Sequence, residues 1–216
     1  MTESLVSDSA HAGRMDRMYR TQRHIYDATR KYYLFGRDTL IDGLDAGAGA
    51  RVLEVGCGTG RNLALIAKRY PQARLYGLDI SAEMLISAEK ALAGRAATLK
   101  TADATDFEAR AFGVEGFERI VISYALSMIP DWEKAIDAAL DALAPDGSLH
   151  IADFGQQEGL PPIARRILSA WLTRFHVTPR ARLMAVVTAK ARARGLSTET
   201  KALGRGYAWL VICRRT

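Results

Sequence analysis

The stretch from Arg51 to Asn62, RVLEVGCGTGRN, constrains the fold of this chain more than any other. It begins with the apolar pattern of a buried strand, broken by one acid, Glu54, and continues with glycines at positions 56, 58 and 60. A helix pattern starts at about Asn62, where apolar residues recur three and four apart. Strand, glycine turn and helix in this order bring backbone close to a ligand at the carboxyl end of a strand, because glycine has no Cβ and accepts a positive φ. The sequence therefore predicts a ligand site on these glycines.

Strand and helix patterns alternate through the middle of the chain. After the first strand we expect strands at residues 73–79, 96–100, 117–123 and 148–154, with helices at residues 62–70, 81–92 and 131–143. Ser81 is expected to cap its helix in a capping box with Glu83 and Met84, and Pro145–Gly147 to form the turn before the fifth strand. Because helix-length segments separate the strands, they are expected to form a parallel sheet with helices on both faces.

The two ends of the chain depart from this alternation. Residues 1–13 are predicted to be a flexible N-terminus, and residues 14–216 a single domain. Its N-terminal cap helices lie within residues 14–46. The first ends at Gly36, and the second begins with Asp38 as its N-cap. A helical insertion over residues 160–195 contains helices at 161–175 and 180–194. The β-prone runs 197–202 and 206–213 are so close that they must pair antiparallel. The predicted fold is α/β and Rossmann-like, with five parallel strands and a C-terminal antiparallel hairpin.

Length and cysteine content point to an ordinary soluble protein. A chain of 216 residues is long enough to bury a core without disulfides or metal. The two cysteines, Cys57 and Cys213, are too few and too far apart for a metal cluster or a disulfide framework, so we expect no metal and a reducing, cytoplasmic setting. The first 13 residues lack the apolar core of a signal peptide, and no apolar run approaches the roughly 20 residues of a membrane span.

Charge is distributed unevenly along the chain. The net charge is +6, but residues 159–216 alone contain twelve Lys or Arg and a single acid, Glu199. Such a basic quarter favours an anionic partner, which could be a phospholipid surface, a nucleic acid or an acidic subunit. The alternative is that these side chains only keep exposed helices soluble.

The spacing of the glycines separates two classes of cofactor. A nicotinamide site prefers G-x-G-x-x-G, whereas this chain has G-x-G-x-G with Arg61 after the last glycine. Glu54 inside the first strand is not a requirement of dinucleotide sites. Asp79 ends the second strand about twenty residues after the glycines, where a carboxylate can bind ribose hydroxyls in either class. Asp103, at the end of the third strand, can reach a purine amino group.

Together these motifs resemble those of class I S-adenosylmethionine-dependent methyltransferases. The resemblance rests on Glu54-x-Gly56-x-Gly58-x-Gly60, on Leu78–Ser81, on Asp103-Ala104 and on the closing hairpin. It implies S-adenosyl-L-methionine as cofactor and S-adenosyl-L-homocysteine as product. By the same resemblance the cofactor-binding residues are Glu54, Gly56, Cys57, Gly58, Asp79, Ile80, Met84, Asp103, Ala104 and Ser123, and Arg37 is a further cofactor-binding candidate. Gly56 and Gly58 would back the methionyl end, Asp79 would bind ribose, and Ser123 and Tyr124 would face the methyl group.

The methyl acceptor is suggested by segments outside the cofactor motifs. The fourth strand is followed by neither the Asn/Asp-Pro-Pro-Tyr turn of exocyclic-amine DNA methyltransferases nor a catalytic cysteine, which makes nucleic acid an unlikely partner. Five segments, residues 15–27, 30–38, 123–130, 153–157 and 175–180, resemble the bacterial betaine-lipid N-methyltransferase. That family adds three methyls to the amine of diacylglyceryl homoserine. The alternatives are a small-molecule or quinone-type methyltransferase and an RNA-binding or RNA-methylating module.

The tyrosine-rich N-terminal helix supplies the candidate catalytic residues. Tyr19 and Tyr26 are predicted to line the acceptor pocket with Ser123 and Tyr124, since aromatic faces hold alkylated ammonium groups and a hydroxyl can accept a proton. Arg37 is predicted to reach a carboxylate of cofactor or substrate. The alternative is that the tyrosines only pack this helix onto the sheet. For His24, His150 and His176 we expect structural roles.

The predicted helix at residues 161–175 is amphipathic and basic. Its apolar side comprises Ile163, Ile167, Leu168, Trp171, Leu172 and Phe175, while Arg165, Arg166 and Arg174 lie largely off that stripe. Such a helix suits peripheral attachment to an anionic membrane, here its inner face, beside a partner enzyme that makes the lipid amine. The alternative is a lid helix whose apolar stripe packs on the sheet.

Overall fold

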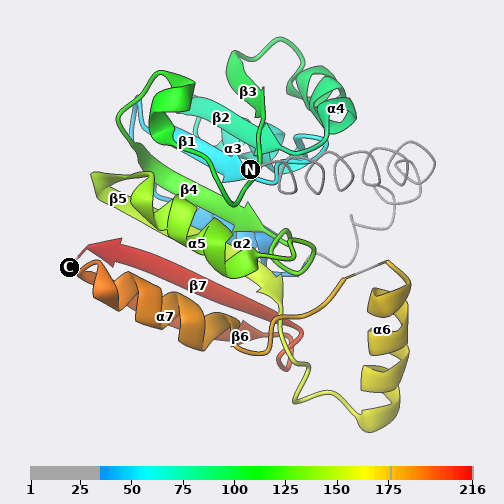
Figure 1. The fold of residues 1–216 in the computed structure, drawn as a ribbon. Helices are drawn as coiled ribbons and strands as arrows, with labels where there is room; N and C mark the ends of the chain where they lie inside the picture. The colour runs from blue at the N-terminus through cyan, green and yellow to red at the C-terminus, as the bar shows by residue number, and fades with distance from the viewer. Residues whose placement is uncertain (1–34, 176, 216) are drawn as a thin grey trace, which may run out of the picture.

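The computed structural model describes residues 35–175 and 177–215, which form a seven-stranded sheet in the order β3-β2-β1-β4-β5-β7-β6, with helices on both faces (Figure 1). The strands are β1 (Arg51–Val55), β2 (Arg74–Asp79), β3 (Ala97–Thr101), β4 (Phe117–Ser123), β5 (Leu143–Phe154), β6 (Leu196–Leu203) and β7 (Ala208–Arg215). Strands β1 to β5 pair in parallel, and β7 runs antiparallel to both β5 and β6. This confirms the predicted fold class.

Two core clusters lie on opposite faces of the sheet. The helices are α2 (Arg37–Asp42), α3 (Arg61–Arg69), α4 (Ala82–Leu92), the 3-10 helix η1 (Ala109–Phe112), α5 (Trp132–Asp141), α6 (Pro162–Arg174) and α7 (Leu183–Ala193). Apolar residues of α2, α3 and α4 join one cluster, and those of η1, α5 and α7 join the other. Helix α6 stands apart, beyond the end of the sheet (Figure 1). No helix within residues 35–175 and 177–215 is long and apolar enough to cross a membrane.

The predicted strands and helices are confirmed with one clear exception at β5. Strand β5 begins at Leu143, five residues earlier than predicted, and residues 145–147, predicted as a turn, lie at the register shift between the pairs Phe117–Leu143 and Arg119–Ser148. Gly147 permits this pairing, since a Cβ at that position would lie 2.6 Å from the Phe117 carbonyl oxygen. The helix before it correspondingly ends at Asp141, two residues earlier than predicted.

Two predicted helix caps differ from the observed ones. Ser81 does cap α4, where its hydroxyl accepts a hydrogen bond from the Met84 backbone N–H at 3.4 Å. The capping box is wrong, because Glu83 is the second residue of the helix and a box requires the acid at the third. Asp38 was predicted to cap α2, but it lies inside the first turn of a helix whose N-cap is Gly36.

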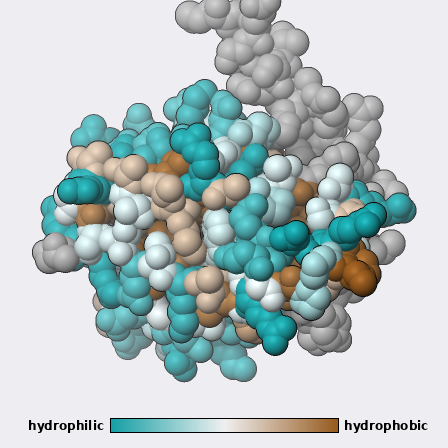
Figure 2. Space-filling view, turned by 90° about the horizontal axis from the view of Figure 1, so that it is seen from below, coloured by the Kyte–Doolittle hydropathy of each residue, from teal (hydrophilic) through white to brown (hydrophobic). Residues whose placement is uncertain are grey.

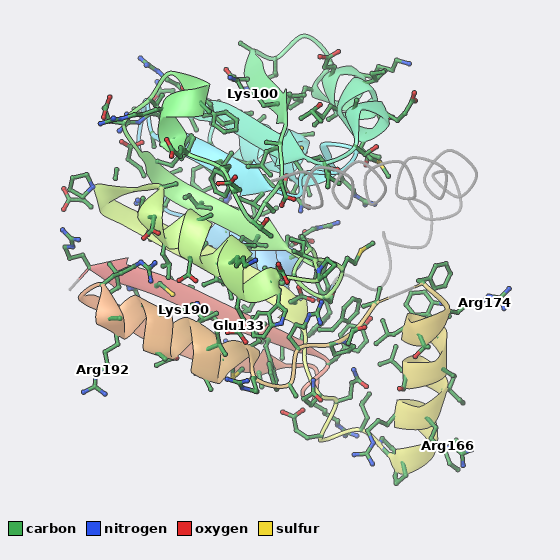
Figure 3. All side chains as sticks on the ribbon, viewed as in Figure 1. Lys100, Glu133, Arg166, Arg174, Lys190 and Arg192 are labelled. Carbon is green, nitrogen blue, oxygen red and sulfur yellow. The ribbon has the colours of Figure 1, made fainter. Side chains whose placement is uncertain are left out.

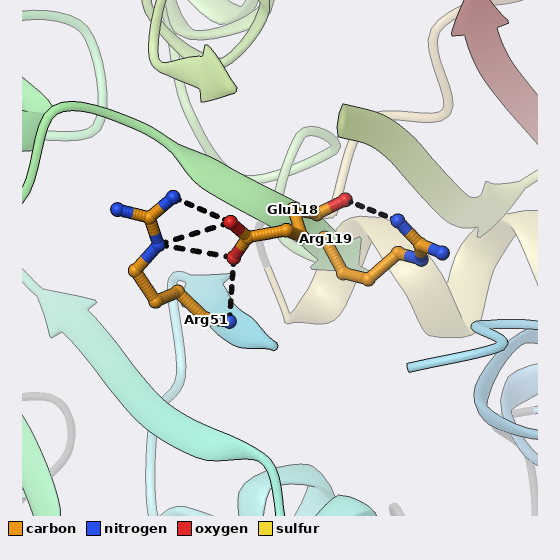
Figure 4. Close-up of polar contacts among 3 residues, drawn as sticks. All are labelled: Arg51, Glu118 and Arg119. Carbon is orange, nitrogen blue, oxygen red and sulfur yellow. Dashed lines mark hydrogen bonds and ion pairs between the residues drawn. The ribbon is translucent and has the colours of Figure 1, made fainter. Parts of the chain in front are cut away.

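An ion pair holds β1 beside β4 at the amino ends of the two strands (Figure 4). The Glu118 carboxylate accepts hydrogen bonds from the Arg51 backbone N–H at 2.7 Å and from Arg51 Nε at 3.0 Å. The neighbouring Arg119 donates to the Asp45 carbonyl at 2.7 Å, which ties the loop before β1 to β4. The hydrogen bond from Arg51 lowers the pKa of Glu118 below its usual value. These contacts set the strand pair on which the site is built.

Several predictions concern residues outside the described ranges. The flexible residues 1–13, most of the helix predicted over 14–36 with Tyr19, His24 and Tyr26, and His176 all fall there. His150 is described and, as predicted, is buried in the core, where its Nε2 lies 2.8 Å from the Ser148 hydroxyl. Burial, reinforced by the charges of Arg119 and Arg214, lowers the pKa of His150 to about 3, so its ring is neutral at physiological pH.

Candidate active site

The candidate site lies at the carboxyl ends of β1 and β4. Strand β1 is followed by a helix that leads to β2 on one side, whereas β4 lies on its other side. The strand order therefore reverses between β1 and β4. In open α/β sheets, ligands bind outside the carboxyl ends of the strands at such a switch point.

The glycine turn has the backbone that the sequence predicted. Gly56, Gly58 and Gly60 have φ values of +70°, +53° and +74°. A Cβ on Gly56 would lie 2.8 Å from the Cβ of Ala125, in the loop after β4, so the two loops approach each other across the mouth of the site. A Cβ on Gly60 would lie 2.7 Å from that of Ala88, which shows that this glycine lets α3 pack closely on α4.

Asp79 is held in place by the turn that it faces. Its carboxylate accepts one hydrogen bond from the Gly58 backbone N–H at 2.8 Å and another from the Ser81 backbone N–H at 3.0 Å. These bonds join the end of β2 to the turn after β1, and they orient the carboxylate at the edge where a ribose is expected. The structure thus brings together Gly58 and Asp79, which are 21 positions apart in the sequence.

Other predicted cofactor residues line up along the ends of β1, β2 and β3. Glu54 is buried and accepts a hydrogen bond from the Asn62 amide at 2.7 Å, so it orients the first turn of α3. Ile80 is partly exposed beside Asp79, and Met84 is buried in the first turn of α4. Asp103 accepts hydrogen bonds from the backbone N–H and the hydroxyl of Thr105, both at 2.7 Å, and Ala104 next to it is buried.

Cys57 occupies the turn with its backbone alone. Its N–H donates to the Leu78 carbonyl at 2.9 Å, whereas its thiol is buried in the core, close to Gly77 of β2. Burial raises the pKa of this thiol well above its usual value, and the nearby carboxylates of Glu54 and Asp79 raise it further. The thiol is therefore uncharged, which suits a packing role.

Ser123 and Tyr124 both lie where β4 ends. The Ser123 hydroxyl is buried and has no hydrogen-bond partner within the described residues, so it remains able to contact a ligand. Tyr124 has a φ of +56°, its ring packs edge-on against Phe154 at 4.7 Å between centroids, and its hydroxyl donates to the Phe35 carbonyl. The Tyr124 side chain is thus a buried link to the segment before α2, and its predicted catalytic role stays a prediction.

Arg37 follows that linked segment at the start of α2. Its side chain is only 9% exposed, and Nε and Nη2 both lie 2.9 Å from the Asp38 carboxylate. The third nitrogen, Nη1, is buried and has no hydrogen-bond partner among the described residues. A buried guanidinium nitrogen without a partner is able to donate to a carboxylate, and the predicted role of Arg37 stays a prediction.

The loop after β4 is held by two residues to which sequence reasoning assigned no role, Asp153 and Arg180. The Asp153 carboxylate, at the end of β5, accepts a hydrogen bond from the Ser127 backbone N–H at 3.1 Å. Arg180 donates from Nε to the Leu126 carbonyl at 3.0 Å and from Nη2 to the Ile129 carbonyl at 2.6 Å. Complete burial raises the pKa of Asp153 to about 6, against its hydrogen bonds and the charge of Arg180. Asp153 could have been found from the sequence, because it is an acid at the end of a buried strand, as Asp79 is. Nothing in the sequence singled out Arg180.

Known proteins resemble this chain in both sequence and structure. Residues 52–147 match the family described as methyltransferase domain. A solved structure of the plantazolicin methyltransferase BpumL, in complex with a triazolic desmethylPZN analog and SAH, superposes with a TM-score of 0.72 at 15% identity and covers 99% of this chain and 98% of that one. This likeness establishes the fold. Residues 52–147 form a class I, S-adenosylmethionine-dependent methyltransferase domain.

The curated relatives of this methyltransferase domain act on other acceptors than the one predicted. Trans-aconitate 2-methyltransferase of Streptomyces avermitilis is 39% identical over 101 residues, which are 46% of this chain and 37% of that protein. Demethylmenaquinone methyltransferase of Thermus thermophilus is 28% identical over 134 residues, 60% of each protein. The chain thus spans between a third and two thirds of these relatives. Their names indicate trans-aconitate and demethylmenaquinone as acceptors and do not support the betaine-lipid specificity.

Proposed function

We propose that the protein transfers methyl groups from S-adenosylmethionine to an amine carried by a lipid. By the resemblance described above, the amine is that of diacylglyceryl homoserine and the product its trimethylated betaine. In this proposal the protein works at the inner face of the membrane as a peripheral enzyme, beside the enzyme that makes the lipid amine.

One observation carries the proposal, namely the convergence of the segments that resemble the lipid enzyme. Four of the five segments contain described residues, and three of them each contact the fourth, residues 123–130, at the loop after β4. Tyr124 binds the Phe35 carbonyl, Ser127 binds Asp153, and the Ser127 carbonyl accepts a hydrogen bond from the Thr178 N–H at 2.9 Å. Arg180 completes the set through the Leu126 and Ile129 carbonyls. These segments are spread over more than 140 positions of the chain. Their shared resemblance to one family is expected if together they form the acceptor side of the site.

Methyl transfer depends mainly on the alignment of the amine with the methyl group of the cofactor. S-adenosylmethionine, when bound, supplies an electrophilic methyl on a sulfonium. The lone pair of a neutral amine forms the new N–C bond as the C–S bond breaks, the electron pair goes to sulfur, and the amine proton leaves to a base. Holding the two reactants in line supplies much of the rate. Asp79 and the glycine turn would hold the cofactor, Arg37 would pair with a carboxylate, and Ser123 would face the reacting end. Tyr19 and Tyr26 remain the proposed proton acceptors and ammonium contacts.

The curated relatives favour a second candidate, a small-molecule or quinone methyltransferase. These relatives support it by their sequence identity to the chain. The match to the methyltransferase family covers residues 52–147. An RNA methyltransferase is a weaker alternative that rests on the basic C-terminal quarter.

Mass spectrometry of the methylated products separates these candidates. The purified protein is supplied with isotope-labelled S-adenosylmethionine and, in parallel, with diacylglyceryl homoserine in detergent, trans-aconitate, a demethylated quinone and total RNA. We expect stepwise labelling of the lipid amine alone, and loss of labelling in Asp79→Asn. Labelling of trans-aconitate, quinone or RNA without any label on the lipid would replace the proposal by the corresponding alternative.

A further inference from the structure

Helix α6 exposes apolar side chains at the end of the molecule that carries the site. It follows β5 and stands beyond the carboxyl ends of the parallel strands (Figure 1). Ile163 is 76% exposed and Ile167 is 67% exposed, the two highest values among the large apolar residues of the described ranges. Seen from below, a strongly hydrophobic patch with hydrophilic neighbours lies at the rim where Figure 1 places this helix (Figure 2).

The apolar side of α6 is divided between the protein and solvent. Leu172 is buried, and Leu168, Trp171 and Phe175 pack partly buried against the core cluster of α2, α3 and α4. The rings of Trp171 and Phe175 lie 4.9 Å apart. This half of the stripe therefore packs against the protein, and Trp171 is less available as a membrane anchor than the sequence indicated. Ile163 and Ile167 lie on the outward side, because they are offset around the helix from the buried half.

Arg166 and Arg174 are exposed near these isoleucines, whereas Arg165 is exposed on the opposite side of the helix. The three arginines have no acidic partners within residues 35–175 and 177–215. Arg166 and Arg174 project from the side of α6 that faces away from the sheet (Figure 3). Two basic residues at the end of α7 differ, because Lys190 pairs with Asp137 and the C-cap residue Arg194 pairs with Asp137 and Asp141 of α5. Lys190 and Arg194 are thus neutralised by α5, whereas the described residues offer no such partner to Arg166 and Arg174 of α6.

We infer that α6 docks the protein on an anionic lipid surface. Its two outward isoleucines would enter the boundary between headgroups and acyl chains, and Arg166 and Arg174 on the same side would contact lipid phosphates. A nucleic acid would use the arginines but leave the isoleucines in water. This inference extends the proposed function, since a lipid amine lies in such a surface, yet docking can be measured without any acceptor.

The connection after α6 leads directly to the loop of the candidate acceptor side. Thr178 and Arg180 follow the helix within six residues and bind the loop of residues 124–130 through the backbone contacts described above. A docked α6 would therefore hold the mouth of the site at the lipid surface, where substrate arrives by lateral diffusion.

Vesicle sedimentation tests the docking with matched variants. The full chain is mixed with phosphatidylcholine vesicles with or without phosphatidylglycerol at low salt. We expect binding only to the anionic vesicles, reduced at least about tenfold in Ile163→Ser/Ile167→Ser and by about fivefold for each arginine removed, as in Arg166→Ala or Arg174→Ala. The controls are Ile86→Ser, a 48% exposed isoleucine on α4, and Arg192→Ala, an exposed arginine on α7 (Figure 3), which should bind like the wild type. Circular dichroism verifies that each variant is folded.

Each other outcome overturns the docking. These outcomes are absence of binding to anionic vesicles, equal binding by the isoleucine variant, and a loss of binding in the controls as large as on α6. Two outcomes, each without vesicle binding, would assign the surface to another partner. One is RNA binding that depends on the arginines alone, and the other is a dimer that dissociates in the isoleucine variant. Failure of the proposed function is distinguishable, because a wild type that binds vesicles but labels no lipid amine retains the docking and loses the acceptor. If the protein labels the detergent-dispersed lipid but does not bind vesicles, the acceptor is retained and the docking is lost.

Discussion

Replacing Gly56 by alanine is the sharpest test of the cofactor site. Gly56 has a φ of +70°, and its new Cβ would lie 2.8 Å from the Cβ of Ala125, whereas ordinary contact begins at 3.4 Å. Neither atom is the end of a flexible side chain, so the glycine turn or the loop after β4 must move. Both border the place where the methionyl end of the cofactor is expected.

The size of the effect follows from the cost of overpacking. Inserting a methyl into a filled space typically costs about 1–3 kcal/mol. If the two loops relax apart in the free protein and must be forced together for binding, this cost weakens the cofactor dissociation constant by roughly 5- to 150-fold. Isothermal titration calorimetry with S-adenosylmethionine and S-adenosylhomocysteine measures it directly.

Gly49→Ala is the matched control, because Gly49 has a φ of +77° and no atom within 4 Å of its would-be Cβ. It carries the same positive-φ cost, about 1–2 kcal/mol, without the clash, so it should lower stability and leave cofactor affinity unchanged. The double variant Gly56→Ala/Ala125→Gly should recover part of the lost affinity. Equal cofactor affinities of Gly56→Ala and Gly49→Ala would refute the assignment of this turn to the cofactor.

Three further substitutions test other parts of the structure. Asp79→Asn loses one charge and one acceptor for the Gly58 and Ser81 N–H groups, and should weaken cofactor binding about 10- to 150-fold by calorimetry; an unchanged affinity would contradict the ribose assignment. Glu118→Gln should lower the free energy of unfolding by about 1 kcal/mol. Because the pKa of Glu118 is lowered in the fold, this difference should be constant above pH 4.5, the usual value, and shrink as pH falls below it in urea titrations, while a pH-independent difference would exclude the charge as its cause. Arg180→Gln should lower kcat at least about tenfold with cofactor affinity retained, because the loop after β4 loses two hydrogen bonds; an equal fall in cofactor affinity would indicate general destabilisation instead.

The cofactor half of the site was predictable because its determinants are close together in the sequence. A glycine turn directly after a strand and an acid at the end of the next strand specify both residue type and position, and the structure places Gly58 and Asp79 in contact. Glu54 was noticed for its chemistry, but its partner Asn62 was noted only as the start of a helix. The capping box failed because it depends on a shift of one residue, which the sequence pattern does not resolve.

The side of the site after β4 was not predictable in this way. Asp153, Thr178 and Arg180 bind one loop from two separate parts of the chain, and no spacing rule relates such distant positions. Most of these contacts use the backbone of the loop, so the identities of the loop residues carried no signal for Arg180.

The amino-acid sequence by itself determined the order of strands and helices, the closing hairpin and the glycine turn, because periodicity and turn chemistry act over a few neighbouring residues. Only the tertiary structure decided which apolar and charged residues remain free for partners. One amphipathic stripe on α6 became a buried half around Leu172 and an exposed half around Ile163 and Ile167, according to where the core cluster lies. The basic quarter likewise contains Lys190 and Arg194, which pair with α5, and arginines that face solvent, such as Arg166 and Arg174. Burial and ion pairing depend on what lies opposite a side chain, and the folded chain alone brings those neighbours together.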